Sequence, residues 1–181
     1  MFQVDIVEKC KQNDRKAQLK LYKQYCDGML IVAKRFVKDS MEAEDVVQES
    51  FIKAFTKLEQ YKAEVTFGAW LKRIVINKSI DLLKSKKQRL VDLDNVQLKV
   101  VDDNDDWSVD VSLSIDDVKL AIEQLQEKYK YVVMLYLIEG YDHQEIADIL
   151  NISEVASRTQ LSRGKTKLRA LLNSNKNGTE S

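Results

Sequence analysis

The stretch EGYDHQEIADILNISEVASRTQLSRGKTKLRALL, residues 139–172, decides the fold of the C-terminal part of the chain. Asp142 is followed three residues later by Glu145, a capping box that predicts the start of a helix. Asn151-Ile152 predicts a tight turn, and Ser153 can cap a second helix. Two short helices joined by such a turn form a helix-turn-helix, which presents its second helix to the DNA major groove.

The second helix of this pair, predicted over residues 154–172, is basic, with five cations and one acid. Its inward side is predicted to carry Leu161, Leu168 and Leu172. Its outward side is predicted to carry Val155, Ala156, Thr159, Ser162, Arg163 and Thr166, with Arg158 and Gln160 at the edges. Because charged helix faces are often only solvated, spacing and charge alone leave DNA binding and plain packing as equal alternatives.

The composition predicts an all-α protein. The chain has 181 residues, 44% of them apolar, with no Pro and only five Gly, and few breakers favour helix. No long apolar run and no signal peptide is present, so a cytoplasmic location is expected. Cys10 and Cys26 lack metal-ligand spacing and are interpreted as reduced thiols. His143, the only histidine, is interpreted as a surface residue.

The sequence offers no catalytic, metal or cofactor site. It has no metal-ligand spacing, no nucleophile with a histidine partner and no Gly-rich phosphate loop. An enzyme is therefore the least favoured class of protein.

The net charge is zero, but the charge alternates along the chain. Residues 61–91 carry eight cations and two acids, whereas residues 92–117 carry one cation and nine Asp. The local field, and not the total, decides whether nucleic acid can bind. The pattern predicts two small helical domains joined by an acidic, flexible linker. The predicted parts are an N-terminal domain over 1–88, the linker over 89–112, a C-terminal domain over 113–173, and a flexible tail over 174–181.

Several helices are predicted within the N-terminal domain. Asn13-Asp14 can cap a helix that runs to about Val37, with Leu19, Tyr22, Leu30 and Phe36 among its core candidates. Asp39 and Glu42 form a second capping box for a helix that runs to about Leu58. A loop over 60–66 and a helix over 67–87 follow. The C-terminal domain is predicted to begin with helices over 113–125 and 129–139.

The helix over 41–58 has two unlike faces. Its core stripe is predicted to be Ala43, Val47, Phe51, Ala54 and Leu58. The opposite side carries Asp45, Gln48, Glu49 and Ile52. This side is either a solvated face or an acidic surface for a cationic partner.

The helix over 67–87 combines basic and aromatic groups. Leu71, Ile74, Val75 and Leu82 are predicted to be buried. Another side carries Trp70, Arg73, Asn77 and Lys84, and Tyr61 and Phe67 lie near its start. Cations beside rings and an amide suit single-stranded nucleic acid, while ordinary core packing is the alternative for the aromatics.

Together these blocks resemble a known family. MEAEDVVQESFIKAF at 41–55, FGAWLKRIVINKSIDLLK at 67–84, an acidic linker and the helix-turn-helix are similar to bacterial sigma factors of the extracytoplasmic function (ECF) group of the sigma-70 family. The resemblance covers roughly residues 5–172. It implies a non-enzymatic protein that binds RNA polymerase core, directs it to promoters and helps to melt DNA. It also implies an anti-sigma factor as a further partner, with no insertion into the membrane.

The resemblance also implies roles for residues. The clamp of the largest polymerase subunit would bind Asp45, Gln48, Glu49 and Ile52. The loop 61–67 would receive a base flipped from the minus-ten element, whose contacts would be Tyr61, Lys62, Phe67, Trp70, Arg73, Asn77 and Lys84. The minus-thirty-five element would contact Ser157, Arg158, Thr159, Gln160, Arg163 and Lys167. The polymerase flap would bind apolar residues near the last helix.

The chain departs from the family at several positions. Val155-Ala156 stands where members usually have Gly-Thr, and Thr159 stands where Ser is common. Gly164 replaces a common Ala, which predicts a helix weaker by up to about 1 kcal/mol. A stand-alone helix-turn-helix regulator remains an alternative function, although it leaves the basic-aromatic helix without a role. An interaction protein is a second alternative, which would not need a basic last helix.

Overall fold

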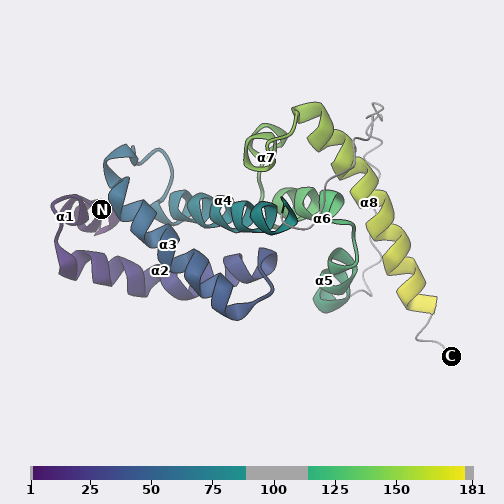
Figure 1. Cartoon of the computed structure of the whole chain (residues 1–181), viewed down its shortest axis with the longest axis horizontal. Coiled ribbons are helices and arrows are strands. Elements are labelled where there is room, and N and C mark those ends of the chain that lie inside the picture. The colour runs from purple at the N-terminus through teal and green to yellow at the C-terminus, as the bar shows by residue number, and fades with distance from the viewer. Residues whose placement is uncertain (1, 89–113, 178–181) are drawn as a thin grey trace. The chain divides into compact units, whose positions relative to one another are not determined.

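The computed structural model describes residues 2–88 and 114–177 (Figure 1). These residues form helices, turns and loops, and within the two ranges no strand occurs, which confirms the all-α prediction. The chain divides into two compact units, residues 1–93 and 94–181. The predicted linker over 89–112 lies outside the described ranges, so the predicted domain boundaries there stay predictions.

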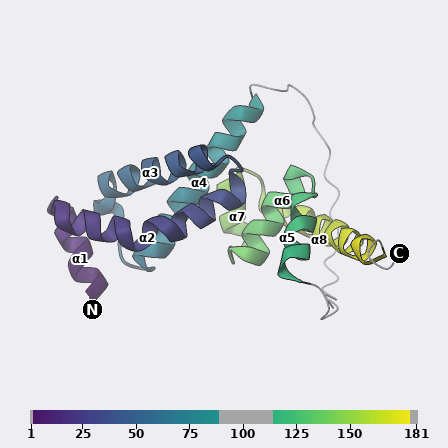
Figure 2. The ribbon, with the colours of Figure 1, turned by 90° about the horizontal axis from the view of Figure 1, so that it is seen from below.

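The N-terminal unit is a bundle of helices. Its elements are α1 (Phe2–Lys11), α2 (Arg15–Phe36), α3 (Ser40–Thr56), the short 3₁₀ helix η1 (Leu58–Gln60) and α4 (Phe67–Gln88). Both ribbon views show α2, α3 and α4 side by side (Figures 1 and 2), and each of the three contacts the other two. The predicted Asp14 cap is confirmed, because its carboxylate accepts from the backbone N–H groups of Lys16 and Ala17.

The core of this unit follows the predicted stripe on α3 but only part of the predictions for α2 and α4. Every member of the predicted stripe, Ala43 to Leu58, is buried, although α3 ends at Thr56 and Leu58 lies in η1. On α4, Ile76 and Ile80 are buried, whereas the predicted Ile74 and Leu82 are half-buried. The buried arc of α4 is rotated because this helix packs against both α2 and α3. On α2, Leu19 is 54% exposed, so its assignment to the core was wrong.

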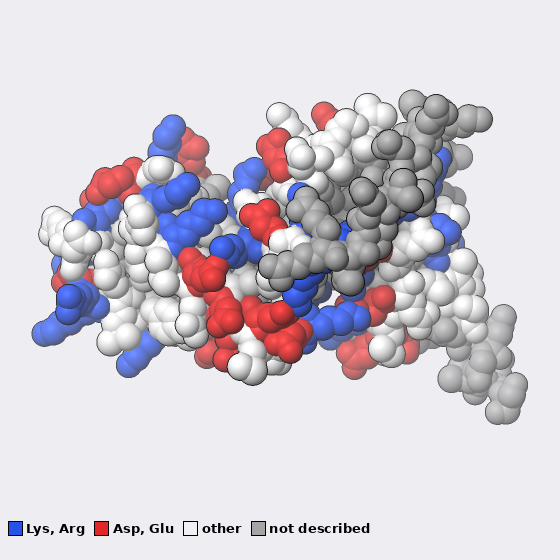
Figure 3. All heavy atoms as spheres, in the orientation of Figure 1, with Lys and Arg blue, Asp and Glu red and all other residues white. Residues whose placement is uncertain are grey.

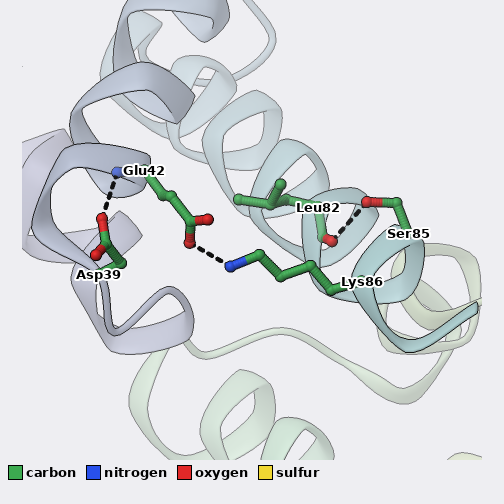
Figure 4. Close-up of polar contacts among 5 residues, drawn as sticks. All are labelled: Asp39, Glu42, Leu82, Ser85 and Lys86. Atoms are coloured by element: carbon green, nitrogen blue, oxygen red, sulfur yellow. Dashed lines mark hydrogen bonds and ion pairs between the residues drawn. The ribbon is translucent and has the colours of Figure 1, made fainter. Parts of the chain in front are cut away.

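The start of α3 contacts the end of α4 through an ion pair. Asp39 accepts a hydrogen bond from the backbone N–H of Glu42 at 3.0 Å, as predicted for a helix cap. The Glu42 carboxylate, however, pairs with Lys86 of α4 (Figure 4) instead of closing the predicted capping box. A contact between residues 44 positions apart depends on how the helices pack, which local spacing does not reveal.

The C-terminal unit contains the predicted helix-turn-helix. Its elements are α5 (Ile115–Glu123), α6 (Glu127–Val133), the π-helical segment η2 (Met134–Ile138), α7 (His143–Leu150) and α8 (Glu154–Asn177). The capping box of Asp142 and Glu145 is confirmed, with both hydrogen bonds formed. Asn151 has a φ of 56° in the turn, and Ser153 Oγ accepts from the N–H of Ala156 at 3.1 Å. The helix α8 continues to Asn177, past Leu172, where the prediction ended it.

Gly164 lies where α8 meets α6. A Cβ at this position would lie 2.7 Å from Cγ2 of Val133 and 3.4 Å from Cβ of Tyr129. Val133 is fully buried. The glycine therefore allows two helices to approach closely, a packing role that helix propensity alone does not reveal.

Both cysteines are free thiols, as predicted. Burial raises the pKa of Cys10 to about 11, and the nearby Asp14 adds to the effect. Burial and a hydrogen bond with Asp27 raise the pKa of Cys26 as well, so both thiols are mostly protonated at pH 8. Because only a thiolate attacks a disulfide reagent and Cys10 is 2% exposed whereas Cys26 is half-buried, we expect Cys26 to react at least about tenfold faster than Cys10. Raising the pH toward 11 should increase the rate at which Cys10 reacts. Ellman's reagent on the Cys10→Ala and Cys26→Ala variants measures the rate of each remaining thiol. Equal rates at pH 8 would contradict the expected difference in reactivity.

Within residues 2–88 and 114–177, none of the helices has the length and apolar character needed to cross a membrane.

Candidate partner and nucleic-acid interfaces

The outward face of α3 is accessible and acidic. Asp45, Gln48 and Glu49 are exposed, and Ile52 beside them is 67% exposed. Figure 3 shows acidic side chains gathered over α3 on the face that it displays. An exposed Ile within an acidic face has the composition of a partner surface, in which charges steer the encounter and an apolar group is buried.

Glu49 is not isolated on this face. Its carboxylate lies 2.5 Å from Nζ of Lys78, which projects from α4. The two residues border a groove of about 460 Å³ between α3 and α4, which Asp45 and Asp81 also line. Sequence reasoning missed Lys78 and Asp81, because their place beside Glu49 depends on the register of two helices. A cationic partner of Glu49 therefore competes with an internal lysine.

The three aromatic residues near the start of α4 form one cluster. The ring centroids of Tyr61 and Trp70 lie 5.3 Å apart, and the Phe67 ring lies 5.9 Å from each. Tyr61 and Trp70 are half-buried, but Phe67 is only 1% exposed and also packs against Tyr25. The prediction that Phe67 contacts DNA directly is therefore corrected: its ring belongs to the core and supports the other two.

The loop before α4 is held in one conformation by its own contacts. The Tyr61 hydroxyl donates to the carbonyl oxygen of Val65 at 2.7 Å. Burial raises the pKa of Tyr61, so the hydroxyl keeps its proton at neutral pH. Ala63 has a φ of 59°, which is unusual for a residue with a Cβ, and Thr66 Oγ1 accepts from the N–H of Ala69. Such strain is found at functional sites.

The other predicted minus-ten residues are accessible. Lys62 is exposed on the loop. Arg73, Asn77 and Lys84 are half-buried, like Trp70, and follow it at helical spacing along one side of α4. A partly exposed ring beside an amide and two cations can stack a base, bond a base edge and follow phosphates.

The predicted DNA-facing residues of α8 fall into two groups. Arg158 and Lys167 are exposed, and Gln160 and Arg163 are half-buried. Ser157 and Thr159, in contrast, are 0% and 2% exposed, so the prediction that they contact DNA directly is corrected.

The burial of Ser157 follows from the inward stripe of α8. Ser157 and Gly164 continue the stripe of Leu161, Leu168 and Leu172 at intervals of three and four. Thr159 stands two positions from both Ser157 and Leu161, about 200° round the helix from each, so the stripe does not explain its burial. All of these residues are buried. The small residues at 157 and 164 were the signal in the sequence, because small side chains on an apolar stripe mark a close helix contact.

His143 is a structural residue that the sequence interpretation placed on the surface. It is 8% exposed, and its Nδ1 lies 2.9 Å from Oγ of Ser157 on α8. Its ring also stacks on Tyr136, with centroids 5.0 Å apart. The first helix of the helix-turn-helix is thereby joined to the second through a buried polar contact.

The basic side chains of α8 are braced by local contacts. Arg158 Nη2 pairs with Glu154 at 2.6 Å, one turn earlier. Lys167 Nζ lies over the Tyr129 ring, 5.7 Å from its centroid.

Across residues 2–88 and 114–177, no cluster of three or more acidic, His or Cys side chains could hold a metal ion.

Comparison with known proteins identifies the family. Residues 21–89 match the family model described as Sigma-70 region 2, and residues 115–168 match that of Sigma-70, region 4. The two matches together cover more than half of the chain.

Individual relatives agree with these matches. The chain is 29% identical over 177 residues to the ECF RNA polymerase sigma factor SigW of Bacillus subtilis, covering 92% of this chain and 94% of that protein. It is 29% identical over 173 residues to the ECF RNA polymerase sigma-E factor of Haemophilus influenzae, covering 88% of this chain and 89% of that protein. The fold is similar to that of the sigma factor RpoE from Bartonella quintana, solved in complex with the anti-sigma factor NepR. The TM-score is 0.57 and the identity 19%, and the match covers 85% of this chain and 95% of that chain. The chain belongs to the sigma-70 family, as an RNA polymerase sigma factor of the ECF group.

Proposed function

We propose that this sigma factor divides its work among three surfaces. The acidic face of α3 binds the clamp of the polymerase largest subunit, the loop and α4 bind the melted minus-ten element, and α8 binds the minus-thirty-five duplex. The observation that carries the proposal is that one unit bears two unlike faces, an exposed acidic one on α3 and a basic-aromatic one on α4. A protein that bound only DNA would not need the exposed acidic face on α3.

The α3 face suits a cationic partner. Asp45, Gln48 and Glu49 offer acceptors, and exposed Ile52 offers an apolar contact at the same place. Complementary charges speed docking and fix its orientation. The partner must displace Lys78 from Glu49, which makes the contact sensitive to salt.

The loop and α4 suit a single strand. Extruding a base from a duplex costs a few kcal/mol, and a preformed pocket that holds the base offsets this cost. The Tyr61–Val65 hydrogen bond and the aromatic cluster keep the loop preformed, so little ordering is required on binding. Trp70 and Asn77 supply stacking and base contacts, while Arg73 and Lys84 follow the backbone. Lys62 supplies a further cation.

The α8 surface suits a duplex. Arg158, Gln160, Arg163 and Lys167 are accessible along one helix that the helix-turn-helix presents. A bidentate pair between Arg and guanine gives about 1–3 kcal/mol of discrimination. Ser157 and Thr159 contribute by packing, so the promoter sequence is read mainly by the longer side chains.

Further features belong to the same proposal. Sigma factors are generally non-enzymatic, and the synthesis of RNA falls to the polymerase. An anti-sigma factor is a proposed regulator of this chain, and the cytoplasm is its proposed location. The minus-ten and minus-thirty-five surfaces would lie on separate domains, over 1–88 and 113–173, joined by the acidic linker.

Neutralising the α3 face tests the first contact. The double variant Asp45→Asn/Glu49→Gln keeps the shape of both side chains, and we expect it to bind core polymerase about tenfold or more weakly because charge attraction is lost. Glu44→Gln removes an exposed acid of the same helix outside the groove and should bind like the wild type. Titration of labelled protein with core polymerase at two salt concentrations measures both affinities. Equal losses in the two variants would contradict the assignment.

A further inference from the structure

A cavity of about 540 Å³ lies between α1 and the loop that precedes α4. The loop and the first residue of α4 supply one wall, from Tyr61 to Phe67. The helix α1 supplies the other wall through Val7, Glu8 and Lys11. The match to region 2 begins only at residue 21, so α1 lies before the matched segment. In this chain, therefore, the loop is completed by a helix that the family model does not include.

The polar part of the α1 wall is an ion pair held in place. Lys11 Nζ donates to Oε1 of Glu8 at 2.8 Å, and only 20% of the lysine side chain is exposed. The bond to Glu8 holds the pKa of Lys11 above its ordinary value, and Glu59 and Tyr61 add to the effect. Neighbouring Val7 is 3% exposed and anchors the helix at this point. The ion pair therefore favours the charged form of the lysine.

The chemistry of the cavity suits an unpaired nucleobase. Its size falls within the range of about 300–1,000 Å³ that is usual for small-ligand sites. An ammonium group only donates hydrogen bonds, and a carboxylate only accepts them. The Watson–Crick edge of every base places a donor beside an acceptor, which matches such a pair. The half-buried Tyr61 ring in the opposite wall offers a surface for the base ring.

We propose that Glu8 and Lys11 contact the Watson–Crick edge of the extruded minus-ten base, so that α1 helps to set which base is accepted. This inference rests on the proposed capture of a base by the loop. Adenine and cytosine carry an amino donor where guanine and thymine carry a carbonyl acceptor, so a carboxylate and an ammonium in fixed positions would discriminate between these two classes of base by the order of donor and acceptor. These two residues would act on specificity at one promoter position.

Four full-length variants test the inference. Lys11→Met and Glu8→Gln each remove one charge while keeping the length of the side chain. The double variant Glu8→Lys/Lys11→Glu keeps both charges and the pair but exchanges donor and acceptor. Lys9→Met removes a cation from the same helix outside the cavity and serves as the control. Each variant is assembled with core polymerase, and transcription is measured on a promoter library with randomised minus-ten bases.

The expected result is confined to one base position. Because a hydrogen bond to a charged group affects binding by about tenfold or more, each single variant should change the ratio of the preferred base to the others by about that factor. The exchanged pair should alter which base is preferred, and Lys9→Met should keep the wild-type preference. Preferences identical to wild type in all variants would overturn the inference, as would a uniform fall for all bases, which indicates a phosphate contact.

Failure of the inference is distinguishable from failure of the proposed function. If the wild-type protein initiates at promoters with a clear minus-ten preference that the variants share, only the role of α1 is wrong. If the wild type gives no promoter-specific starts, the proposed function itself is wrong. Affinity for core polymerase, measured alongside, shows that each variant is folded.

Discussion

Replacing His143 by alanine is expected to destabilise the C-terminal unit by about 2–4 kcal/mol, because a buried ring is lost and a buried hydroxyl loses its partner. The imidazole is 8% exposed, stacks on Tyr136 and meets Ser157 Oγ at 2.9 Å. Ser157 is fully buried, so water cannot easily replace the lost contact. Hydrogen exchange of the α7 and α8 amides in urea measures the change locally.

A double-mutant cycle separates the polar contact from packing. Ser157→Ala removes the other partner, and the pair should show a coupling of about 0.5–3 kcal/mol, the range for residues in contact. Binding to minus-thirty-five duplex should weaken in His143→Ala at temperatures where the unit begins to open, although His143 does not face DNA. Unchanged protection of α8 would show that the buried contact contributes nothing to stability.

Replacing Gly164 by alanine is expected to destabilise the same unit by about 1–2 kcal/mol, against the trend of helix propensity. Alanine should strengthen a helix by about 1 kcal/mol relative to glycine. Here its Cβ would lie 2.7 Å from Cγ2 of Val133, a rigid and fully buried side chain. Overpacking of this kind costs about 1–3 kcal/mol, which exceeds the gain.

Gly28 provides a matched control for this prediction. It lies within α2, and a Cβ there would meet nothing within 4 Å. Gly28→Ala should therefore stabilise the N-terminal unit by about 0.5–1 kcal/mol. Hydrogen exchange of the amides in each unit, measured at increasing urea concentration, gives the change in the free energy of unfolding for each variant. If both alanines stabilise, the close contact between α6 and α8 is not rigid and the packing role of Gly164 is wrong.

The sequence predicted the local features of the fold well. Asp14, Asp142 and Ser153 cap helices where their spacing indicated, because caps depend on residues within one turn. Asn151 adopts the left-handed conformation at the predicted turn. These signals were sufficient for the class of fold and for the helix-turn-helix.

Features that depend on packing between helices were predicted less well. Glu49 pairs with Lys78 and Glu42 pairs with Lys86, and neither pair follows from local spacing. The predicted outward side of α8 included Ala156 and Thr159, which are buried, and the predicted inward stripe did not include the small Ser157 and Gly164, which extend it. Thr159 is buried although it lies on the side of α8 away from this stripe, so its burial does not follow from helical spacing.

The site residues show the same division. Exposed charges on α3 and α8 were placed correctly on accessible faces, because their periodicity identifies a face. The burial of His143 was not predicted, and that of Phe67 was only the alternative to DNA contact, because an aromatic or polar residue at a helix start can lie on either side. Their burial depends on Tyr25 and Ser157, which come from other helices.

Transcription with purified bacterial core polymerase tests the central claim most directly. A library of genomic fragments is transcribed with and without this protein, and the start sites are mapped. The account predicts specific starts that appear only with the protein and that share two promoter elements. If no such starts appear while the protein alone shifts duplex fragments, the chain acts as a stand-alone regulator and the account of its function is contradicted.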